Sequence, residues 1–172
     1  MEAKRIFILG ISGSGKSTLA KKLSKSLSIR VFDLDNIFWI QKFSEKRDDA
    51  DCEKELKKLL AREESWIVEG VYDWGKIAAD EADLLIWLNY GINVSTYRVL
   101  RRWIFSKREK RESILEMYGL IRYLRAYKRV RPNRKYSTYE KHQFVLAGNE
   151  HKIVEVKNKK DMSVLLRELG AL

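Results

Sequence analysis

Short apolar runs alternate with amphipathic stretches along the chain. In each run the apolar residues follow one another directly, as in strands buried on both faces of a sheet, rather than alternating with polar residues. The predicted strands are Lys4–Leu9, Ile29–Asp33, Trp66–Glu69, Asp83–Leu88 and Lys152–Val156. Because it is apolar from Leu84 onward, the fourth run is expected near the centre of the sheet.

Amphipathic helices are predicted between these strands. Apolar residues recur at helical spacing after Lys16 and again in Asp48–Glu64, a stretch that begins with the acidic residues that helix N-termini favour. A last helix is predicted from Asp161, its expected cap, to Leu169. Strands that alternate with helices in this way predict an α/β fold in which helices cover both faces of a parallel sheet.

The stretch from residue 93 to residue 141 departs from this alternation. Its pattern is mostly helical, it contains the only proline of the chain, Pro132, and no part of it has a strand pattern. We therefore expect a single domain over residues 1–172, in which residues 93–141 form a helical insertion or lid.

Composition argues against several classes of protein. With 45% apolar residues, the chain can form a hydrophobic core and is not expected to be disordered. The longest apolar run has five residues, Leu84–Leu88, whereas a membrane-spanning helix needs about 20, so no membrane partner is expected. The apolar run after the N-terminal charges is too short for a signal peptide, and Cys52 has no second cysteine for a disulfide. These features predict a cytoplasmic protein.

The positive charge is concentrated in one segment. The chain has 35 Lys and Arg against 24 Asp and Glu, and residues 98–141 alone account for the net charge of +11. Such a segment attracts anions, for which nucleotide phosphates, nucleic acid and acidic lipids are candidates. A solvated helical face without a partner is the alternative interpretation.

A phosphate-binding loop follows the first predicted strand. Residues 10–17 read Gly-Ile-Ser-Gly-Ser-Gly-Lys-Ser and match the P-loop pattern in full, between a buried strand and an amphipathic helix. Glycines let successive backbone N–H groups point at phosphate oxygens. Lys16 is expected to reach the β- and γ-phosphates of ATP, and the Ser17 hydroxyl to bind Mg²⁺. The predicted ATP-binding residues are Gly10, Ser12, Gly13, Ser14, Gly15, Lys16, Ser17 and Thr18.

Three acidic residues follow or end the next two predicted strands. Asp33 and Asp35 are expected on the same side of an extended segment, and parallel strands would bring them and Glu69 beside the phosphates. Asp33 is the candidate general base or ligand of Mg²⁺-bound water, and Glu69 the candidate for the outer metal shell. The alternatives are a turn or helix cap for the aspartates and a plain surface position for Glu69. An Asn-Lys-x-Asp guanine motif is absent from the sequence, which disfavours a GTPase.

With these motifs, the chain resembles the adenylate-kinase-like P-loop kinases, most of all the adenylate-kinase-related DNA topology modulation proteins. The resemblance runs through residues 32–39, 66–72, 82–88 and 98–102, besides the P-loop. It implies a three-layer α/β/α P-loop fold with a five-stranded parallel sheet, Mg·ATP as the phosphate donor, and a mobile basic lid.

Departures from true adenylate kinases point to another phosphate acceptor. Those kinases carry Asp-Gly-Phe-Pro-Arg, whose arginine binds the AMP phosphate, where residues 69–73 here read Glu-Gly-Val-Tyr-Asp. The Asp-x-Asp at Asp33 and Asp35 is closer to shikimate and gluconate kinases, where such carboxylates bind an acceptor hydroxyl. Acids in place of arginines predict a neutral or cationic hydroxyl compound, with AMP a poor acceptor. The resemblance implies substrate-binding positions at Asp35, Phe38, Gly70 and Tyr72.

Three arginines match the lid of the similar kinases. Arg98 and Arg102 are four residues apart and share a helix face, with Arg101 beside them. The resemblance implies that Arg98 and Arg102 close over the ATP phosphates and stabilise charge during transfer, a role that suits the planar, bidentate guanidinium. A solvated helix end is the alternative.

The leading functional hypothesis is a kinase that uses ATP and Mg²⁺ to phosphorylate a small hydroxyl-bearing or nucleotide-like acceptor. Its predicted catalytic residues are Lys16, Asp33, Arg98 and Arg102, its predicted metal-binding residues Ser17, Asp33 and Glu69, with Arg101 contacting ATP. A nucleotide-binding regulator without turnover is a further alternative.

A nucleic-acid-associated P-loop ATPase or polynucleotide kinase is the alternative of a different class. Residues 98–141 interleave tyrosines with basic residues, as a weak, sequence-independent surface for single-stranded nucleic acid would. Against this interpretation, four residues of the segment have helical spacing and predict a buried face. They are Leu115, Tyr118, Ile121 and Leu124.

Overall fold

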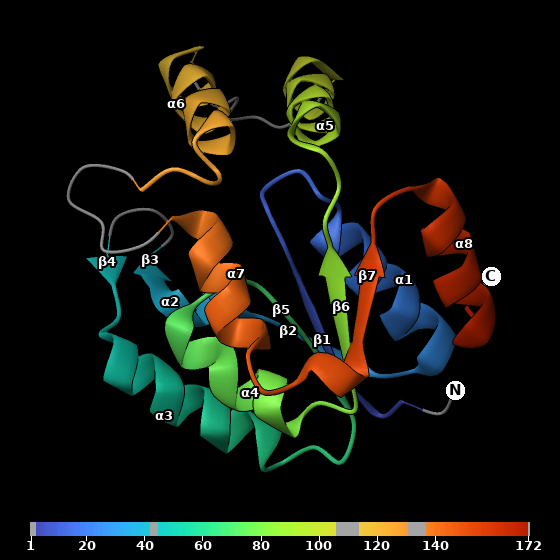
Figure 1. Cartoon of the computed structure of the whole chain (residues 1–172). Coiled ribbons are helices and arrows are strands. Elements are labelled where there is room, and N and C mark those ends of the chain that lie inside the picture. Colours follow the sequence, from blue (N-terminus) through green and yellow to red (C-terminus); the bar gives the residue numbers. More distant parts are fainter. Residues whose placement is uncertain (1–2, 42–44, 106–113, 131–136, 172) are drawn as a thin grey trace.

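A five-stranded parallel β-sheet forms the centre of the protein (Figure 1). The computed structural model of the chain describes residues 3–41, 45–105, 114–130 and 137–171. The strands lie in the order β2-β5-β1-β6-β7, and each neighbouring pair is parallel. Their bounds are β1 Arg5–Gly10, β2 Arg30–Asp33, β5 Trp66–Glu69, β6 Leu84–Leu88 and β7 Ile153–Val156. All five predicted strands are confirmed, although the central place belongs to β1 and not to the fully apolar β6.

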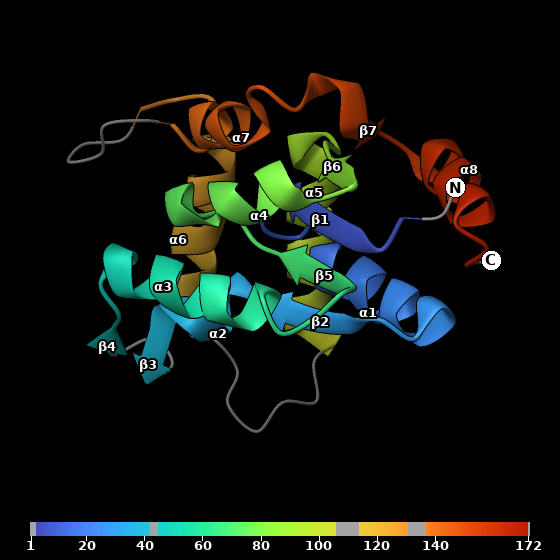
Figure 2. The ribbon, with the colours of Figure 1, turned by 90° about the horizontal axis from the view of Figure 1, so that it is seen from below.

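Helices cover both faces of this sheet, as the strand pattern predicts (Figure 2). One face packs against α1 and α8 through side chains such as Leu23 and Leu165. The other packs against α3, α4 and α7 through Leu56, Ala79 and Val145. The helices are α1 Lys16–Leu27, α2 Leu34–Phe38, α3 Asp49–Leu60, α4 Lys76–Glu81, α5 Ile92–Phe105, α6 Ile114–Arg125, α7 Thr138–Leu146 and α8 Lys159–Glu168, with short 3₁₀ turns at Asp73–Gly75 and Glu150–Lys152.

Helices α5 and α6 lie beyond the carboxyl ends of the strands, at the top of Figure 1. They form a third hydrophobic cluster, in which Val99 of α5 and Met117 and Leu124 of α6 pack together with Ile11 of the P-loop. The predicted helical character of residues 93–141 therefore agrees with the described part of this segment. The described helices include none with the length and apolar character needed to cross a membrane.

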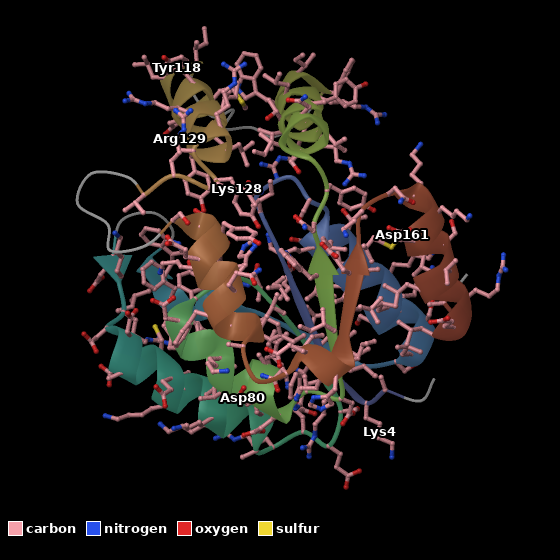
Figure 3. All side chains as sticks on the ribbon, in the orientation of Figure 1. Lys4, Asp80, Tyr118, Lys128, Arg129 and Asp161 are labelled. Atoms are coloured by element: carbon pink, nitrogen blue, oxygen red, sulfur yellow. The ribbon has the colours of Figure 1, made fainter. Side chains whose placement is uncertain are left out.

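The prediction of the buried face of α6 is wrong in part. Leu115 is 81% exposed and Tyr118 65% exposed, whereas Met117 and Leu124 are buried. Tyr118 stands out from the body of the protein in Figure 3. The helical period is confirmed, and Leu124 and Ile121 of the predicted face do pack toward α5, but Met117 takes the place expected for Leu115 and Tyr118.

Two local predictions also need correction. The segment after β2 does not continue extended, because Leu34–Phe38 turns into α2 and a two-stranded hairpin follows, formed by β3 Trp39–Gln41 and β4 Glu45–Lys46. The cap of α8 is Asn158 and not Asp161, which instead occupies the third helical position. Both residues take part in a capping box, in which each side chain accepts a backbone N–H of the other.

The register of the parallel strands gathers three sequence-distant segments at one edge. Ile8 of β1 lies opposite Glu69 of β5, and Glu69 lies opposite Asp33 of β2. On the other side of β1, Gly10 lies opposite Leu88 at the end of β6. The P-loop therefore begins beside the carboxyl ends of β5 and β6, the edge where open α/β sheets bind ligands.

Gly70 allows α2 to approach the end of β5. Its backbone has φ +143°, and a Cβ there would lie 2.7 Å from Cβ of the buried Leu34. We expect Gly70→Ala to lower the free energy of unfolding by about 1–3 kcal/mol, because it adds a clash to an unfavourable backbone conformation. Gly119→Ala is the matched control, since nothing lies within 4 Å of its added Cβ, and it should be neutral or stabilising by up to about 1 kcal/mol. Urea unfolding followed by tryptophan fluorescence measures both, and equal stabilities of the two variants would show that α2 does not need a glycine at this position.

Candidate active site

One turn of the P-loop passes so close to α5 that only glycine fits there. At Gly13, with φ +78°, a Cβ would lie 2.6 Å from the backbone oxygen of Ser95 on α5. The Ser14 N–H donates to the Ile11 oxygen at 3.1 Å and closes the turn. Helix α1 then begins at Lys16, as predicted, so that its N-terminus faces the hollow of the loop.

The Lys16 ammonium group bonds to the loop itself. Its Nζ donates to the oxygen of Gly10 at 2.8 Å and to that of Ile11 at 3.3 Å. Burial lowers the pKa of Lys16, and the nearby carboxylates of Glu69 and Asp35 partly oppose that shift. Because neutral carbonyl oxygens are weaker partners than phosphate, the ammonium group can exchange them for the phosphates of a bound nucleotide.

Ser17 and Glu69 form a paired hydroxyl and carboxylate beside the loop. Ser17 Oγ donates to Glu69 Oε2 at 2.9 Å, and Glu69 is only 5% exposed at the end of β5. Burial raises the pKa of Glu69, and the hydrogen bond from Ser17 opposes that shift only in part. In the described residues no cluster of three His, Cys, Asp or Glu could hold a metal ion by itself. Mg²⁺ ordinarily binds through few protein ligands together with substrate phosphates, and Ser17 with Glu69 fits that donor set.

The two aspartates after β2 serve different local roles. Asp33 is the N-cap of α2, where its Oδ1 accepts the backbone N–H of Asp35 at 2.9 Å. Asp35 lies within α2, and its Oδ1 accepts the hydroxyl of Tyr72 at 2.7 Å. Burial, together with this bond to Asp35, raises the pKa of Tyr72 well above its usual value. The tyrosine therefore remains protonated and donates. Asp33 therefore caps a helix, as the alternative interpretation expects, and it also lines the cavity described below.

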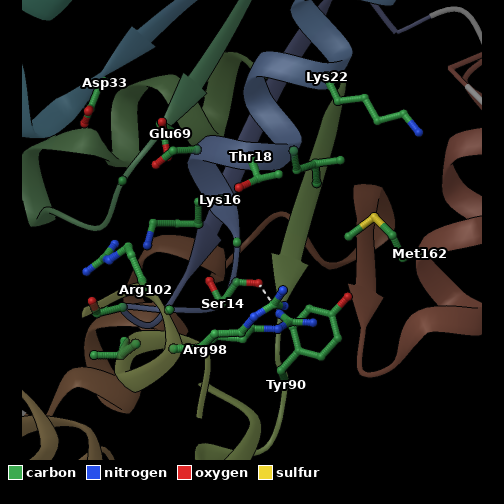
Figure 4. A pocket seen from close by; sticks show the side chains of 18 of the residues that line it. Ser14, Lys16, Thr18, Lys22, Asp33, Glu69, Tyr90, Arg98, Arg102 and Met162 are labelled. Carbon is green, nitrogen blue, oxygen red and sulfur yellow. Dashed lines mark hydrogen bonds between the residues drawn. The ribbon is translucent and has the colours of Figure 1, made fainter. Parts of the chain in front are cut away.

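Arg98 joins α5 to the P-loop. One of its guanidinium nitrogens, Nη1, donates to the Ser14 oxygen at 2.8 Å, and the guanidinium lies 4.1 Å from the centre of the Tyr90 ring (Figure 4). Arg102, one turn further along α5, points toward Lys16 from the same side of the site in Figure 4. Burial lowers the pKa of Lys16, and Arg102 lowers it further. A site that holds these cations together is suited to several negative charges.

These groups line one cavity of about 1000 Å³. It brings together most of the predicted site residues: Ser12, Gly13, Ser14, Gly15, Lys16, Ser17, Thr18, Asp33, Asp35, Glu69, Gly70, Arg98, Arg101 and Arg102. Three predicted residues are not on its lining. Gly10, the first residue of the loop, is buried, while Tyr72 bonds to Asp35 and has its ring centre 4.8 Å from that of Phe38. The roles assigned to all these residues stay predictions.

Part of the cavity has no counterpart in the sequence motifs. At its far end it is lined by residues from the end of β6 and from α1, α5 and α8, some of which are labelled in Figure 4. They are Leu19, Lys22, Tyr90, Val99, Phe105, Lys159, Met162, Ser163 and Leu166. The position of Tyr90 just after a buried strand was a weak indication, in the sequence, that this residue would line the site. The α8 residues had none, because only the fold brings α8 beside the P-loop helix.

Comparison with known families supports a P-loop kinase of the adenylate-kinase-like superfamily. The family model described as shikimate kinase matches residues 12–72, which is less than half of the chain. An uncharacterized Bacillus subtilis protein, YqaC, is 43% identical over 86 residues, covering 49% of this chain and 48% of that protein. A cytidylate kinase from Sulfurisphaera tokodaii is 31% identical over 111 residues, covering 56% of this chain and 61% of the enzyme. The chain thus spans about half to three fifths of these curated relatives.

Solved structures share the fold along the whole chain. A shikimate kinase from Bacteroides thetaiotaomicron has a TM-score of 0.57 at 17% identity and covers 98% of this chain, with 99% of its own length matched. A sugar kinase from Janibacter has a TM-score of 0.54 at 15% identity, covering 99% of this chain and 96% of its own. The predicted P-loop kinase α/β fold is therefore confirmed.

The buried Glu69 provides a pH-dependent test of the site. Since its pKa is raised in the folded protein, the charged carboxylate disfavours folding, so its contribution to stability is lost as pH rises through that pKa. We expect Glu69→Gln to raise the melting temperature at pH 7, and the gain to disappear as pH falls toward the pKa of an unfolded carboxyl, about 4.3. Melting curves from pH 4 to pH 8 measure this.

The control for the loss of one negative charge is Glu64→Gln, an exposed position before β5. It should leave the pH dependence of the melting temperature as in the wild type. A Glu69→Gln protein that is less stable than wild type at pH 7 would contradict the electrostatic argument and indicate that the bond to Ser17 dominates.

Proposed function

We propose that the protein is an adenylate-kinase-related kinase that transfers the γ-phosphate of Mg·ATP to a hydroxyl-bearing small molecule. The observation that carries this proposal is the shared cavity. Its lining includes the P-loop, the arginines Arg98, Arg101 and Arg102 of α5, and the carboxylates Asp33, Asp35 and Glu69. Kinases use cations to bind the phosphates of the donor and a carboxylate to accept the proton of the acceptor hydroxyl, and this cavity has both kinds of group.

Each group has a proposed role in the reaction. Lys16, Arg98 and Arg102 bind the phosphates and stabilise the charge that spreads over the transferred group, with Arg101 as a further contact to ATP. The oxygen of the acceptor hydroxyl bonds to the γ-phosphorus while the bond from that phosphorus to the bridging oxygen breaks, releasing ADP. The proton of the hydroxyl passes to the Asp33 carboxylate and then to water.

The metal site would be formed jointly by protein and nucleotide. Ser17 would provide a direct ligand, and Asp33 and Glu69 would hold water molecules of the outer shell. Mg²⁺ bound there supplies charge neutralisation of the phosphates. The bond between Ser17 and Glu69 at 2.9 Å supports this arrangement, because it keeps both oxygens beside the loop.

The finer relationship is to the DNA topology modulation proteins within this superfamily. It is supported by the residues that carry the resemblance, of which Trp66–Glu69 and Leu84–Leu88 are the buried strands β5 and β6 on either side of β1. The acceptors named by the relatives, cytidylate and shikimate, are candidates, but both carry acidic groups and the acceptor side of the cavity is itself acidic.

Removing the P-loop lysine tests the proposed reaction. We expect Lys16→Ala to lower acceptor-dependent ADP release by about 10²–10³-fold or more while leaving the fold intact, since electrostatic positioning supplies most of the catalysis. The assay screens nucleosides, nucleotides, sugars and other hydroxyl compounds with Mg·ATP, and melting curves with and without Mg·ATP report binding. Full activity of the variant, or no thermal shift of the wild type by Mg·ATP, would refute the assignment.

Contact with single-stranded nucleic acid is a second candidate function. It is supported by the exposed face of α6, where Leu115 and Tyr118 lie on the surface. Arg122, Arg125 and Arg129 are exposed on the same element and the turn after it. Figure 3 shows Arg129 and Lys128 near the base of this helix. Aromatic and basic side chains together favour weak, sequence-independent binding.

The lid and nucleic-acid roles should separate by mutation. Arg102→Ala should lower phosphoryl transfer by about 10³-fold, as for an arginine finger, and barely change retention of single-stranded DNA. The triple change of Arg122, Arg125 and Arg129 to Ala should do the reverse, with retention that fades steeply from low to physiological salt. Filter binding and ADP release measure the two effects. Of the arginines in residues 98–141, Arg108, Arg111, Arg131 and Arg134 lie outside the described residues. Salt-resistant, sequence-selective binding would instead promote the nucleic-acid function.

A further inference from the structure

One face of α5 lines the cavity with two kinds of side chain. Arg98, Arg102 and Phe105 are spaced so that they share a face of this helix. Arg101 lies beside them, and all four residues line the cavity. The guanidinium groups are therefore followed, at the last residue of the helix, by a phenyl ring.

The order of these residues along α5 places the ring on the solvent side of the phosphate position. Arg98 donates to the Ser14 oxygen of the P-loop, and Arg102, one turn further on, points toward Lys16 (Figure 4). Phe105 follows almost one turn beyond Arg102, about 10 Å along the helix from Arg98. Since α5 extends outward from the carboxyl ends of the strands (Figure 1), the ring lies further out than the position where Lys16 would hold phosphates.

Phe105 is exposed although it borders a binding cavity. It is 74% exposed, whereas Val99, the other apolar residue of α5 on the lining, is buried in a cluster with Ile11. An apolar ring in water favours contact with any group that removes it from water. Its place on the cavity lining makes a bound reactant that group.

A kinase with this site has to select its acceptor hydroxyl against water. Both present an O–H group, and a carboxylate base such as Asp33 can accept a proton from either. If water reacts, its oxygen bonds to the γ-phosphorus while the bond from that phosphorus to the bridging oxygen breaks, giving ADP and inorganic phosphate, and one water proton passes to the base. Excluding water prevents this side reaction. Because cations and carboxylates attract water, the exclusion needs an apolar surface.

We propose that Phe105 forms an apolar wall over the bound phosphates, which keeps water from the γ-phosphate and so favours transfer to a hydroxyl acceptor. The carbon skeleton of the acceptor completes this wall when it binds. The ring determines specificity and takes no part in bond formation. The inference rests on the proposed function and goes beyond it by naming the residue that selects the acceptor against water.

Release of inorganic phosphate from Mg·ATP without an acceptor tests the inference on the full-length protein. We expect Phe105→Ser to raise this release about tenfold, because a small polar side chain admits water, while KM for Mg·ATP stays as in the wild type. Phe105→Leu keeps an apolar side chain and should restore slow release. Both variants should keep the wild-type melting temperature, since exposed side chains contribute little to stability.

The matched control is Ile104→Ser. Ile104 is the neighbouring residue of α5 and is 52% exposed, but it is not part of the cavity lining. Its substitution should leave phosphate release as in the wild type. With the acceptor identified for the wild type, Phe105→Ser should also form less phosphorylated product per ADP, because part of the γ-phosphate goes to water.

Four outcomes overturn the inference. Release from Phe105→Ser is no faster than from the wild type, release from Ile104→Ser rises equally, or release from Phe105→Leu is as fast as from Phe105→Ser. The fourth is a KM for Mg·ATP that rises together with the release, which would indicate displaced arginines. Failure of the proposed function has a different result, since no acceptor would then increase ADP release by the wild type.

Discussion

At Gly10 and Gly13 the backbone of the P-loop passes so close to its neighbours that a side chain has no room, and the arrangement of the site depends on these two close contacts. A Cβ at Gly13 would meet α5 at the Ser95 oxygen, and one at Gly10 would meet β6 at the Leu88 oxygen, 2.7 Å away. The same close approach brings Arg98 to the Ser14 oxygen and Ile11 into the cluster between α5 and α6. The shape of the P-loop and the packing of α5 and α6 therefore depend on each other.

Three charged groups of the site, Lys16, Arg98 and Glu69, each have a weak partner that a substrate can replace. Lys16 bonds to neutral carbonyl oxygens, and Arg98 to a carbonyl oxygen and the face of a ring. Glu69 accepts a hydrogen bond from the Ser17 hydroxyl. Burial shifts the pKa of Lys16 down and that of Glu69 up, so both groups are disfavoured in their charged forms. A polyphosphate with its metal ion offers stronger partners to both, and binding it relieves this cost.

The sequence was sufficient for those features that depend on local pattern. Apolar runs gave the five strands, and the glycine spacing gave the P-loop with the start of α1 at Lys16. The turn of the chain into α2 after Asp33 was predicted only as the alternative of a helix cap, because Leu34 and Ile37 have helical spacing in a segment too short to show a period. The exposure of Tyr118 was missed because a helical period does not tell which face another helix covers. The α8 side of the cavity, including Met162, depends on long-range packing that no motif encodes.

In the proposed kinase, the two ends of the cavity would recognise their ligands by different kinds of interaction. At the nucleotide end, loop N–H groups and cations attract charge over a distance, so a polyphosphate is favoured before any contact is made. At the acceptor end, the carboxylates repel the same polyphosphate, and an uncharged molecule experiences no such attraction. Such a molecule would be held by short-range contacts, among them hydrogen bonds from its hydroxyl groups to the carboxylates that line the cavity. In the proposed reaction this division would keep the acceptor from competing for the P-loop and ATP out of the acceptor position, so that the hydroxyl and the γ-phosphate meet in one orientation.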